Sequence, residues 1–256
     1  MRIVSYNILD GGEGRADPLA EVILAQRPDI VALVEADQSS VVERIAHRAH
    51  MDFIHATGGK KGAALLSRWP IQQTIDHTLL LKGQTIPKSL LEASILEPGG
   101  REWIIGALHL TAHAGEESER EREKEIATVL QVFKRYCDSD TPHLLVGDFN
   151  SNAPDQQIDP EKCKPATRKA WHDNGGHIPR RVVQTILDHG YLDTLRSVNP
   201  QAARTDGSFS TQYPGQRVDY IYTHGIPSGK IKHAWIEQDR LARYASDHFP
   251  IGAEIE

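Results

Sequence analysis

The chain has 256 residues, of which 39% are hydrophobic and 25% are charged, as in an ordinary globular protein with a sizeable core. Its formal net charge of -6 supplies no general attraction to nucleic acid or to an anionic membrane. Two cysteines, Cys137 and Cys163, lack the Cys-x-x-Cys spacing, so neither a thiolate metal site nor a disulfide framework is indicated. No apolar run approaches the roughly 18 residues of a membrane span, and we expect a cytoplasmic monomer without membrane insertion.

Short apolar runs bounded by turn residues predict buried strands along the whole chain. The expected strands cover residues 3–6, 30–34, 63–66, 103–108, 143–146, 218–222 and 251–255. A first helix is expected to begin with Asp17 as its N-cap and Pro18 at its first position, and to end before Pro28. A second is expected over 117–136, with its Glu/Arg-rich first half facing solvent.

Residues 151–181 form the least regular part of the chain, with turn residues and basic residues interleaved. We expect a long loop or a loop-helix insertion, which is either a disordered decoration or a lid that faces substrate. Repeats and linkers are absent from the sequence, so residues 1–256 are expected to form a single domain. Strands mixed with helices predict a layered α/β or α+β fold.

Polar residues with metal- or phosphate-binding chemistry follow three of the predicted strands, namely Asn7, Glu35 and Asp148. Any one of them alone is more typical of a turn or cap residue. Asp148 and Asn150 are two residues apart, so an extended backbone would direct both to the same side. The alternative for this pair is an Asx-turn that leaves a strand.

An acidic residue and an imidazole are adjacent at Asp247 and His248, just before the last predicted strand. His248 could donate a hydrogen bond to a phosphoryl oxygen if a carboxylate held it in its charged form, and Asp219 is a candidate for that carboxylate. His109 lies within an apolar run, where a hydrogen-bonded core histidine and a site residue are equally reasonable interpretations.

Together these segments resemble the endonuclease/exonuclease/phosphatase superfamily, whose members hydrolyse phosphate esters with a divalent metal. Six segments match in the family's order and span the chain from end to end, and six ordered matches are far more specific than any one. They are Ser5-Tyr6-Asn7, Pro28 to Glu35, Ala107-Leu108-His109-Leu110, Gly147-Asp148-Phe149-Asn150-Ser151, Arg217-Val218-Asp219-Tyr220-Ile221 and Ser246-Asp247-His248-Phe249-Pro250.

The resemblance implies a four-layer α/β/β/α sandwich, in which two mixed β-sheets pack face to face, with the active site at one end of the sheets. It also implies roles at matching positions. Glu35 would be the principal metal ligand, assisted by Asn7 and Asp247. Asp148 would orient or deprotonate water, Asn150 and His109 would contact the phosphate, and His248 paired with Asp219 would stabilise the transition state.

Elementary chemistry agrees with these roles, because a phosphate ester is anionic and resists attack by water. Carboxylate and amide oxygens suit a hard cation, so Mg²⁺ is expected, with Mn²⁺ as a plausible substitute. The expected reaction is hydrolysis of a phosphodiester or phosphomonoester by direct attack of water.

The substrate is less well defined by the sequence. Val34 precedes Glu35 where the abasic-site and exonuclease branch of the superfamily typically has Gln, and aromatic residues for stacking bases make up only 6% of the chain. A compact phosphate ester is therefore expected first, and a DNA or RNA endonuclease or exonuclease second. Two further alternatives are a non-catalytic binding module of the same fold and a zinc hydrolase based on His109 and His113, whose spacing suits a helix rather than the expected strand end.

Overall fold

The computed structural model describes residues 1–81 and 84–256, and its strands form two six-stranded sheets. The first sheet has the order β11-β12-β1-β2-β4-β3 and the second the order β5-β6-β7-β8-β10-β9. The strands of the first sheet are β11 (Ile231–Ile236), β12 (Ile251–Ile255), β1 (Arg2–Asn7), β2 (Ile30–Val34), β4 (Ala63–Ser67) and β3 (Asp52–Ala56). Those of the second are β5 (Ile71–Asp76), β6 (Ser89–Leu96), β7 (Glu102–His109), β8 (His143–Asp148), β10 (Asp219–His224) and β9 (Leu192–Asp193).

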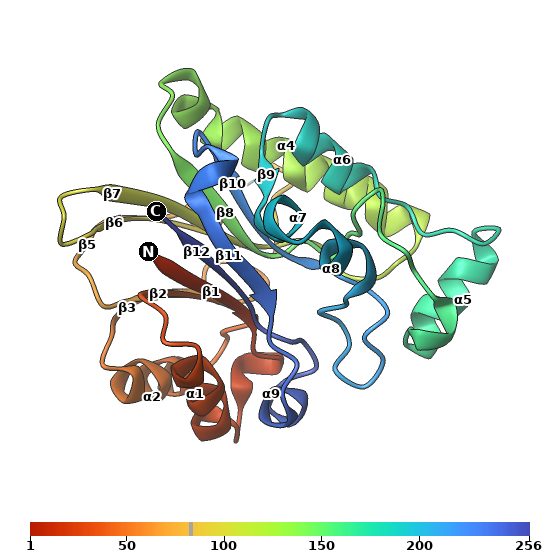
Figure 1. Cartoon of the computed structure of the whole chain (residues 1–256), viewed down its shortest axis with the longest axis horizontal. Helices are drawn as coiled ribbons and strands as arrows, with labels where there is room; N and C mark the ends of the chain where they lie inside the picture. The colour runs from red at the N-terminus through yellow and green to blue at the C-terminus, as the bar shows by residue number, and fades with distance from the viewer. Residues whose placement is uncertain (82–83) are drawn as a thin grey trace.

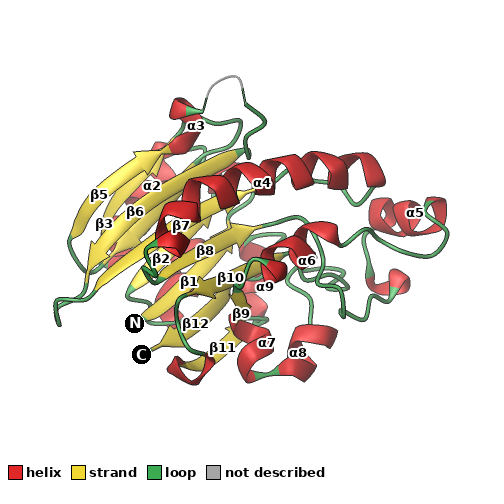
Figure 2. Cartoon of the chain, turned by 90° about the horizontal axis from the view of Figure 1, so that it is seen from above, coloured by secondary structure: helices red, strands yellow, loops and turns green. Residues whose placement is uncertain are grey.

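The two sheets stack face to face with helices on both outer faces, so the molecule has four layers (Figures 1 and 2). The largest core cluster lies between the sheets and is built from their inward-facing side chains, such as Ile3, Leu65, Ile105 and Val146. A second cluster joins the first sheet to α1 (Ala16–Ala25), α2 (Ser39–Ala49) and α9 (Arg240–Ala245). A third joins the second sheet to α4 (Glu116–Asp138) and α6 (Arg181–Asp188). The expected α/β/β/α sandwich with mixed sheets is confirmed.

All seven strands expected from apolar runs are present, whereas β3, β5, β6, β9 and β11 were not expected. Three of these five, β3, β5 and β11, expose several side chains and so lack a continuous apolar run, and β9 has only two residues. The eight-residue strand β6 is buried but interrupts its apolar residues with Glu92 and Ser94, which hides it from a search for apolar runs.

Parallel pairing brings the polar ends of strands together at one edge of the sandwich. β1 runs parallel to β2, and Asn7 pairs with Val34, the residue before Glu35. In the other sheet β7 runs parallel to β8, with His109 opposite Asp148. The antiparallel strand β10 begins there, because Asp219 pairs with Asp148.

Both expected helices form, but two details differ from expectation. Asp17 lies within the first turn of α1 instead of capping it, and its carboxylate pairs with Arg44 and Arg48 of α2. The Glu/Arg-rich half of α4 is not simply solvent-exposed, because Glu119 and Arg122 are completely buried. The sequence pattern misled here since these two charges satisfy each other inside the protein.

The irregular segment 151–181 is a loop-helix insertion that contains the 3-10 turn Pro160–Lys162 and the helix α5 (Pro165–Asp173). Figure 2 shows α5 projecting beyond the end of the sheets. The remaining helices are α3 (His77–Leu80), α7 (Thr194–Val198) and α8 (Pro200–Thr205), with short 3-10 turns at Asp10–Gly12 and Ser228–Lys230. Within the two described stretches, no helix is both long and apolar enough to cross a membrane.

Candidate active site

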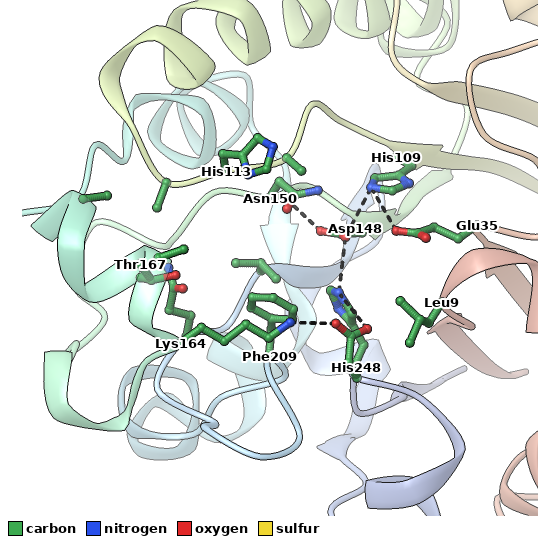
Figure 3. Close-up of a pocket in the computed structure, with 17 residues that line it drawn as sticks. Leu9, Glu35, His109, His113, Asp148, Asn150, Lys164, Thr167, Phe209 and His248 are labelled. Atoms are coloured by element: carbon green, nitrogen blue, oxygen red, sulfur yellow. Dashed lines mark hydrogen bonds and ion pairs between the residues drawn. The ribbon is translucent and has the colours of Figure 1, made fainter.

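A pocket of about 450 Å³ opens at the edge where the polar strand ends meet (Figure 3). Its lining includes Glu35, His109, Asp148, Asn150, Asp247 and His248. Lys164 and Thr167, from the insertion, line it from α5 and the residue before α5. The pocket therefore joins residues from both sheets and from the insertion, and six of the eight residues expected from the sequence line it directly.

Glu35 follows β2 with a left-handed backbone, φ 55°, which turns its side chain toward the pocket. Its Oε2 accepts a hydrogen bond from the Asp10 amide at 3.0 Å and lies 3.3 Å from the Lys61 Nζ. Burial opposes ionisation, but these donors prevail and lower the pKa of Glu35 below its ordinary value. Glu35 is therefore an anion at neutral pH and is available to a cation.

Asp148 ends β8 and is almost completely buried. The Nδ2 of Asn7 donates to its Oδ2 at 3.1 Å, and the same amide lies 3.2 Å from Glu35 Oε1. Burial, followed by the nearby charge of Asp219, raises the pKa of Asp148. A carboxylate with a raised pKa is a better proton acceptor than an ordinary aspartate.

His248 and Asp219 form a buried hydrogen-bonded pair. The His248 Nδ1 donates to Asp219 Oδ2 at 2.9 Å, and its Nε2 lies 3.7 Å from Asp148 Oδ2. Burial alone would lower the pKa of His248, but the two carboxylates outweigh it and raise the pKa to about 10. His248 is thus an imidazolium at neutral pH, with one N–H fixed by Asp219 and the other near Asp148.

His109 is held in the opposite state. It is buried at the end of β7, and burial lowers its pKa to about 3. Its Nε2 lies 2.9 Å from the Nζ of Lys88, which donates to it, so the proton of the neutral ring is on Nδ1. Lys88 was not among the residues expected from the sequence, where its only signal is its place directly before a buried strand.

Asn150 reaches the pocket by a different route from the one expected. Its φ of 50° is left-handed rather than extended, and its backbone N–H donates to Asp148 Oδ1 at 2.9 Å. This is the Asx-turn that the sequence analysis left open. Gly147, just before the turn, lets β8 lie close to β7, since a Cβ there would lie 1.9 Å from the Leu108 carbonyl oxygen. The inference from an extended backbone was wrong, although both side chains line the pocket.

The two carboxylate oxygens of Asp247, which lines the pocket, lie in different environments. Its Oδ2 accepts from the Nζ of Lys164 at 2.8 Å, and that ammonium lies 4.2 Å from the ring centre of Phe209. Its Oδ1 is buried and lies 4.0 Å from the Nε2 of His248, but it has no hydrogen-bond partner among the described residues. A buried carboxylate oxygen without a donor is costly, so a cation is a natural partner for it.

The donors at this site fit a hard divalent cation. Glu35 contributes an ionised carboxylate, and Asp247 contributes an oxygen that accepts no hydrogen bond from the described residues; both line the same pocket. Asp148, Asp219 and His248 also lie close enough together to hold an ion. However, the His248 Nδ1–H donates to Asp219 Oδ2 at 2.9 Å, and a metal ion could bind these two atoms only by replacing that hydrogen bond. We therefore interpret the pair as a histidine that is oriented by a carboxylate.

Two other basic residues belong to the site. Lys61 contacts Asp10 at 2.8 Å, Asp37 at 3.2 Å and Glu35 at 3.3 Å. Lys164 comes from the insertion, whose lysines had no assigned role. These lysines lie in a Gly-rich turn and in an irregular segment, where basic residues have no distinctive spacing that would mark them as site residues.

A buried charge network supports the loop between β7 and α4, which forms one wall of the pocket. Arg122 donates to the carbonyls of Thr111 and His113, at 2.8 and 2.7 Å, and to Glu119 at 2.8 Å. Glu119 in turn accepts from Ser151 Oγ and from the amide of Val182. The unexpected burial of this part of α4 thus connects the pocket wall, the start of the insertion and α6.

Comparison with known proteins agrees with this geometry. The family model of the Endonuclease/Exonuclease/phosphatase family matches residues 4–248. Exodeoxyribonuclease III of Haemophilus influenzae is 26% identical over the whole of both chains. A 3′ phosphatase from Neisseria bound to a product DNA hairpin superposes with a TM-score of 0.74 at 20% identity, over 100% of this chain and 99% of that one. An AP endonuclease from Archaeoglobus fulgidus gives 0.72 at 18% identity, over 100% and 99% of the two chains. The chain therefore belongs to the Endonuclease/Exonuclease/phosphatase family and is a hydrolase of phosphoester bonds.

Proposed function

We propose that this protein is a divalent-metal-dependent phosphoesterase in which water attacks the phosphorus directly. The observation that carries the proposal is the convergence of Glu35, Asp148 and the Asp219–His248 pair on one pocket. Both sheets supply these groups, which supports a single catalytic domain over residues 1–256. A binding module without turnover would not need a buried carboxylate of raised pKa beside a charged imidazole.

The roles follow from the charge states. Asp148 accepts the proton of the attacking water, and Asn7 keeps that carboxylate oriented through the 3.1 Å hydrogen bond. The imidazolium of His248 donates to an oxygen of the phosphate as negative charge accumulates there, while Asp219 holds the ring. Asn150 is placed to contact the phosphate, and neutral His109 lines the pocket beside Asp148.

Glu35 and Asp247 would hold the metal, for which we propose Mg²⁺ with Mn²⁺ as a substitute. The bound cation would neutralise charge on the phosphate and favour the reactive form of water. Asn7 assists from the side, because its amide oxygen accepts from the Leu9 N–H at 3.0 Å and its NH₂ faces Glu35 and Asp148. A zinc site on His109 and His113 is disfavoured, since His109 ends a strand and already contacts Lys88.

For the substrate we propose a compact phosphate ester or the phosphate-bearing end of a DNA strand. Small and apolar side chains, among them Leu9, Ala112, Ala166 and Phe209, also line the pocket. Its volume of about 450 Å³ suits one nucleotide-sized group better than a continuous duplex.

The charges of the insertion support the same substrate class. Every lysine and arginine between residues 159 and 181 is paired with an acidic side chain or with backbone carbonyls, namely Lys162, Lys164, Arg168, Lys169, Arg180 and Arg181. Long duplex DNA is bound mainly through unpaired basic side chains along its phosphates. A DNA end remains in the proposal because the relatives include an exodeoxyribonuclease and a 3′ phosphatase.

The test is a metal-dependent activity panel on DNA with 3′-phosphate ends, supercoiled plasmid, RNA, sugar phosphates and a chromogenic phosphodiester. Each substrate is assayed with Mg²⁺, with Mn²⁺ and with chelator, beside Asp148→Asn and the control Asp52→Asn, an exposed residue at the far end of β3. We expect activity on DNA ends or compact esters that chelator and Asp148→Asn abolish and Asp52→Asn preserves. Full activity in chelator would overturn the metal requirement, and rapid plasmid nicking with no end-directed activity would make the protein an endonuclease.

A further inference from the structure

A second group of metal-ligating side chains lies at the opposite end of the second sheet from the active site. His143 begins β8 and His224 ends β10, and the two residues pair across these strands. The same strands carry Asp148 and Asp219 at their other ends, so the two sites are roughly 17 Å apart along the strands. Cys137 comes from the last turn of α4 and completes the group.

These three residues present their ligand atoms to one another. One atom each of Cys137, His143 and His224 lies within 4.8 Å of the other two. The Cys137 Sγ and the His143 Nε2 are 3.9 Å apart. We propose that they form a site for a borderline divalent cation such as Zn²⁺, and that this site is separate from the catalytic centre.

The hydrogen bonding of His143 is that of a metal ligand. Its Nδ1 donates to the carbonyl of Thr141 at 2.8 Å, which leaves the lone pair on Nε2, the atom that faces the Cys137 sulfur. Histidines that bind metals commonly donate their second ring N–H to a backbone carbonyl in this way. Burial lowers the pKa of His143 to about 4 and also lowers that of His224, so both rings are neutral and able to ligate at pH 7.

His224 brings a second, independent indication. Its Nδ1 is buried and has no hydrogen-bond partner among the described residues. The ring stacks on His143 with centroids 5.0 Å apart. A buried ring nitrogen without a partner is rare in a folded protein, and a ligand would satisfy it.

The hydroxyl of Tyr191 occupies the lone pair of His143 that the cation would bind. Its hydroxyl lies 2.7 Å from His143 Nε2, and it is the donor since that nitrogen carries the lone pair. A bound cation would take this lone pair, leaving the hydroxyl or a water for the fourth position. Zinc holds thiolate and imidazole at about 2.0 to 2.3 Å, which sets neighbouring ligand atoms roughly 3.5 Å apart, so the group must contract slightly. Cys137 would lose its proton to solvent on binding.

The three ligands are separated by 5 and 80 intervening residues and match no compact ligand motif, which is why the sequence indicated no thiolate site. A bound cation would link the C-terminal end of α4 to the start of β8 and the end of β10. Its expected effect is therefore on stability and not on the distant hydrolysis.

The test uses the full chain freed of metal by chelator and then given excess Mg²⁺, so that the active site is occupied. Co²⁺ is titrated while the near-ultraviolet absorption of cobalt-thiolate charge transfer is recorded, because the catalytic pocket has no cysteine among its lining residues and cannot produce this band. We expect one equivalent of Co²⁺ to develop the band, Zn²⁺ to displace it, and the Tm to rise on binding. Cys137→Ser should abolish the band and the Tm shift, whereas Cys163→Ser, at the other, buried thiol, should preserve both.

Failure of the site is distinct from failure of the proposed function. The rate of hydrolysis with Mg²⁺ should be unchanged in Cys137→Ser, whether or not Co²⁺ binds at the cysteine site. His224→Gln provides a second variant, in which Co²⁺ affinity should fall at least tenfold while the fold, measured by circular dichroism, is retained. A wild-type protein without the cobalt-thiolate band, or a band that survives Cys137→Ser, would overturn the proposal and leave the cluster as a packed aromatic group.

Discussion

The Asp219→Asn substitution tests the charge state on which the proposed reaction depends. Asp219 accepts from His248 at 2.9 Å, and together with Asp148 it keeps the pKa of His248 at about 10 against the opposing effect of burial. Asparagine removes the charge at nearly constant volume. A hydrogen bond between charged groups contributes about 1.5 to 3 kcal/mol, and one pKa unit corresponds to about 1.4 kcal/mol. The pKa of His248 should therefore fall by roughly one to two units.

The sign of the effect is fixed by the role of His248 as a donor. Because the protonated ring is the active form, activity is lost as the pH rises through its pKa. In the wild-type protein His248 should stay protonated, and the rate should stay constant, up to about pH 9. In Asp219→Asn the rate should begin to decline at about pH 8. At neutral pH the ring is still protonated in the variant, so the rate should fall far less there than on the alkaline side.

The assay is hydrolysis of a chromogenic phosphodiester at saturating Mg²⁺, with kcat and KM measured at closely spaced pH values. Ser208→Ala is the matched control, because Ser208 donates to the same Asp219 oxygen at 2.6 Å but leaves the carboxylate charge in place. It should reduce the rate modestly without moving the alkaline limb. If Asp219→Asn had the wild-type pH profile, the assignment of His248 as a carboxylate-held imidazolium donor would be wrong.

Two further predictions concern the walls of the pocket. Arg122→Met should lower the free energy of unfolding, measured with urea, by about 3 to 5 kcal/mol, because it leaves the buried Glu119 without its cationic partner. The control is Arg120→Met, at a side chain that is 71% exposed, which should cost less than about 1 kcal/mol. Equal losses in the two variants would contradict the buried network. Lys164→Gln should lower the Mg²⁺ concentration for half-maximal activity by up to about fivefold, because a partly exposed ion pair worth about 1 kcal/mol no longer competes for Asp247. A metal titration monitored by activity measures this shift, and a higher Mg²⁺ requirement would mean that Lys164 does not compete with the cation.

The predicted strands and the order of their polar ends came from local patterns. Buried strands such as β2 and β8 carry uninterrupted apolar runs, and the residues that follow them, Glu35 and Asp148, are identified by that position alone. Half-exposed edge strands such as β3 and β5 have no such run, so they could be found only in the folded chain. The resemblance of six ordered segments to a known family then supplied the four-layer arrangement, which periodicity does not contain.

The sequence by itself determined which acids, amides and imidazoles the chain can bring to phosphate chemistry, because strand ends must be polar and parallel strands end at the same edge. Only the tertiary structure decided their charge states. His109 and His248 are the same residue type, yet burial, helped by Lys88, keeps the first neutral while Asp219 and Asp148 keep the second charged. These effects act through space between residues remote in the chain, as does the meeting of Cys137, His143 and His224, and no local pattern can encode them.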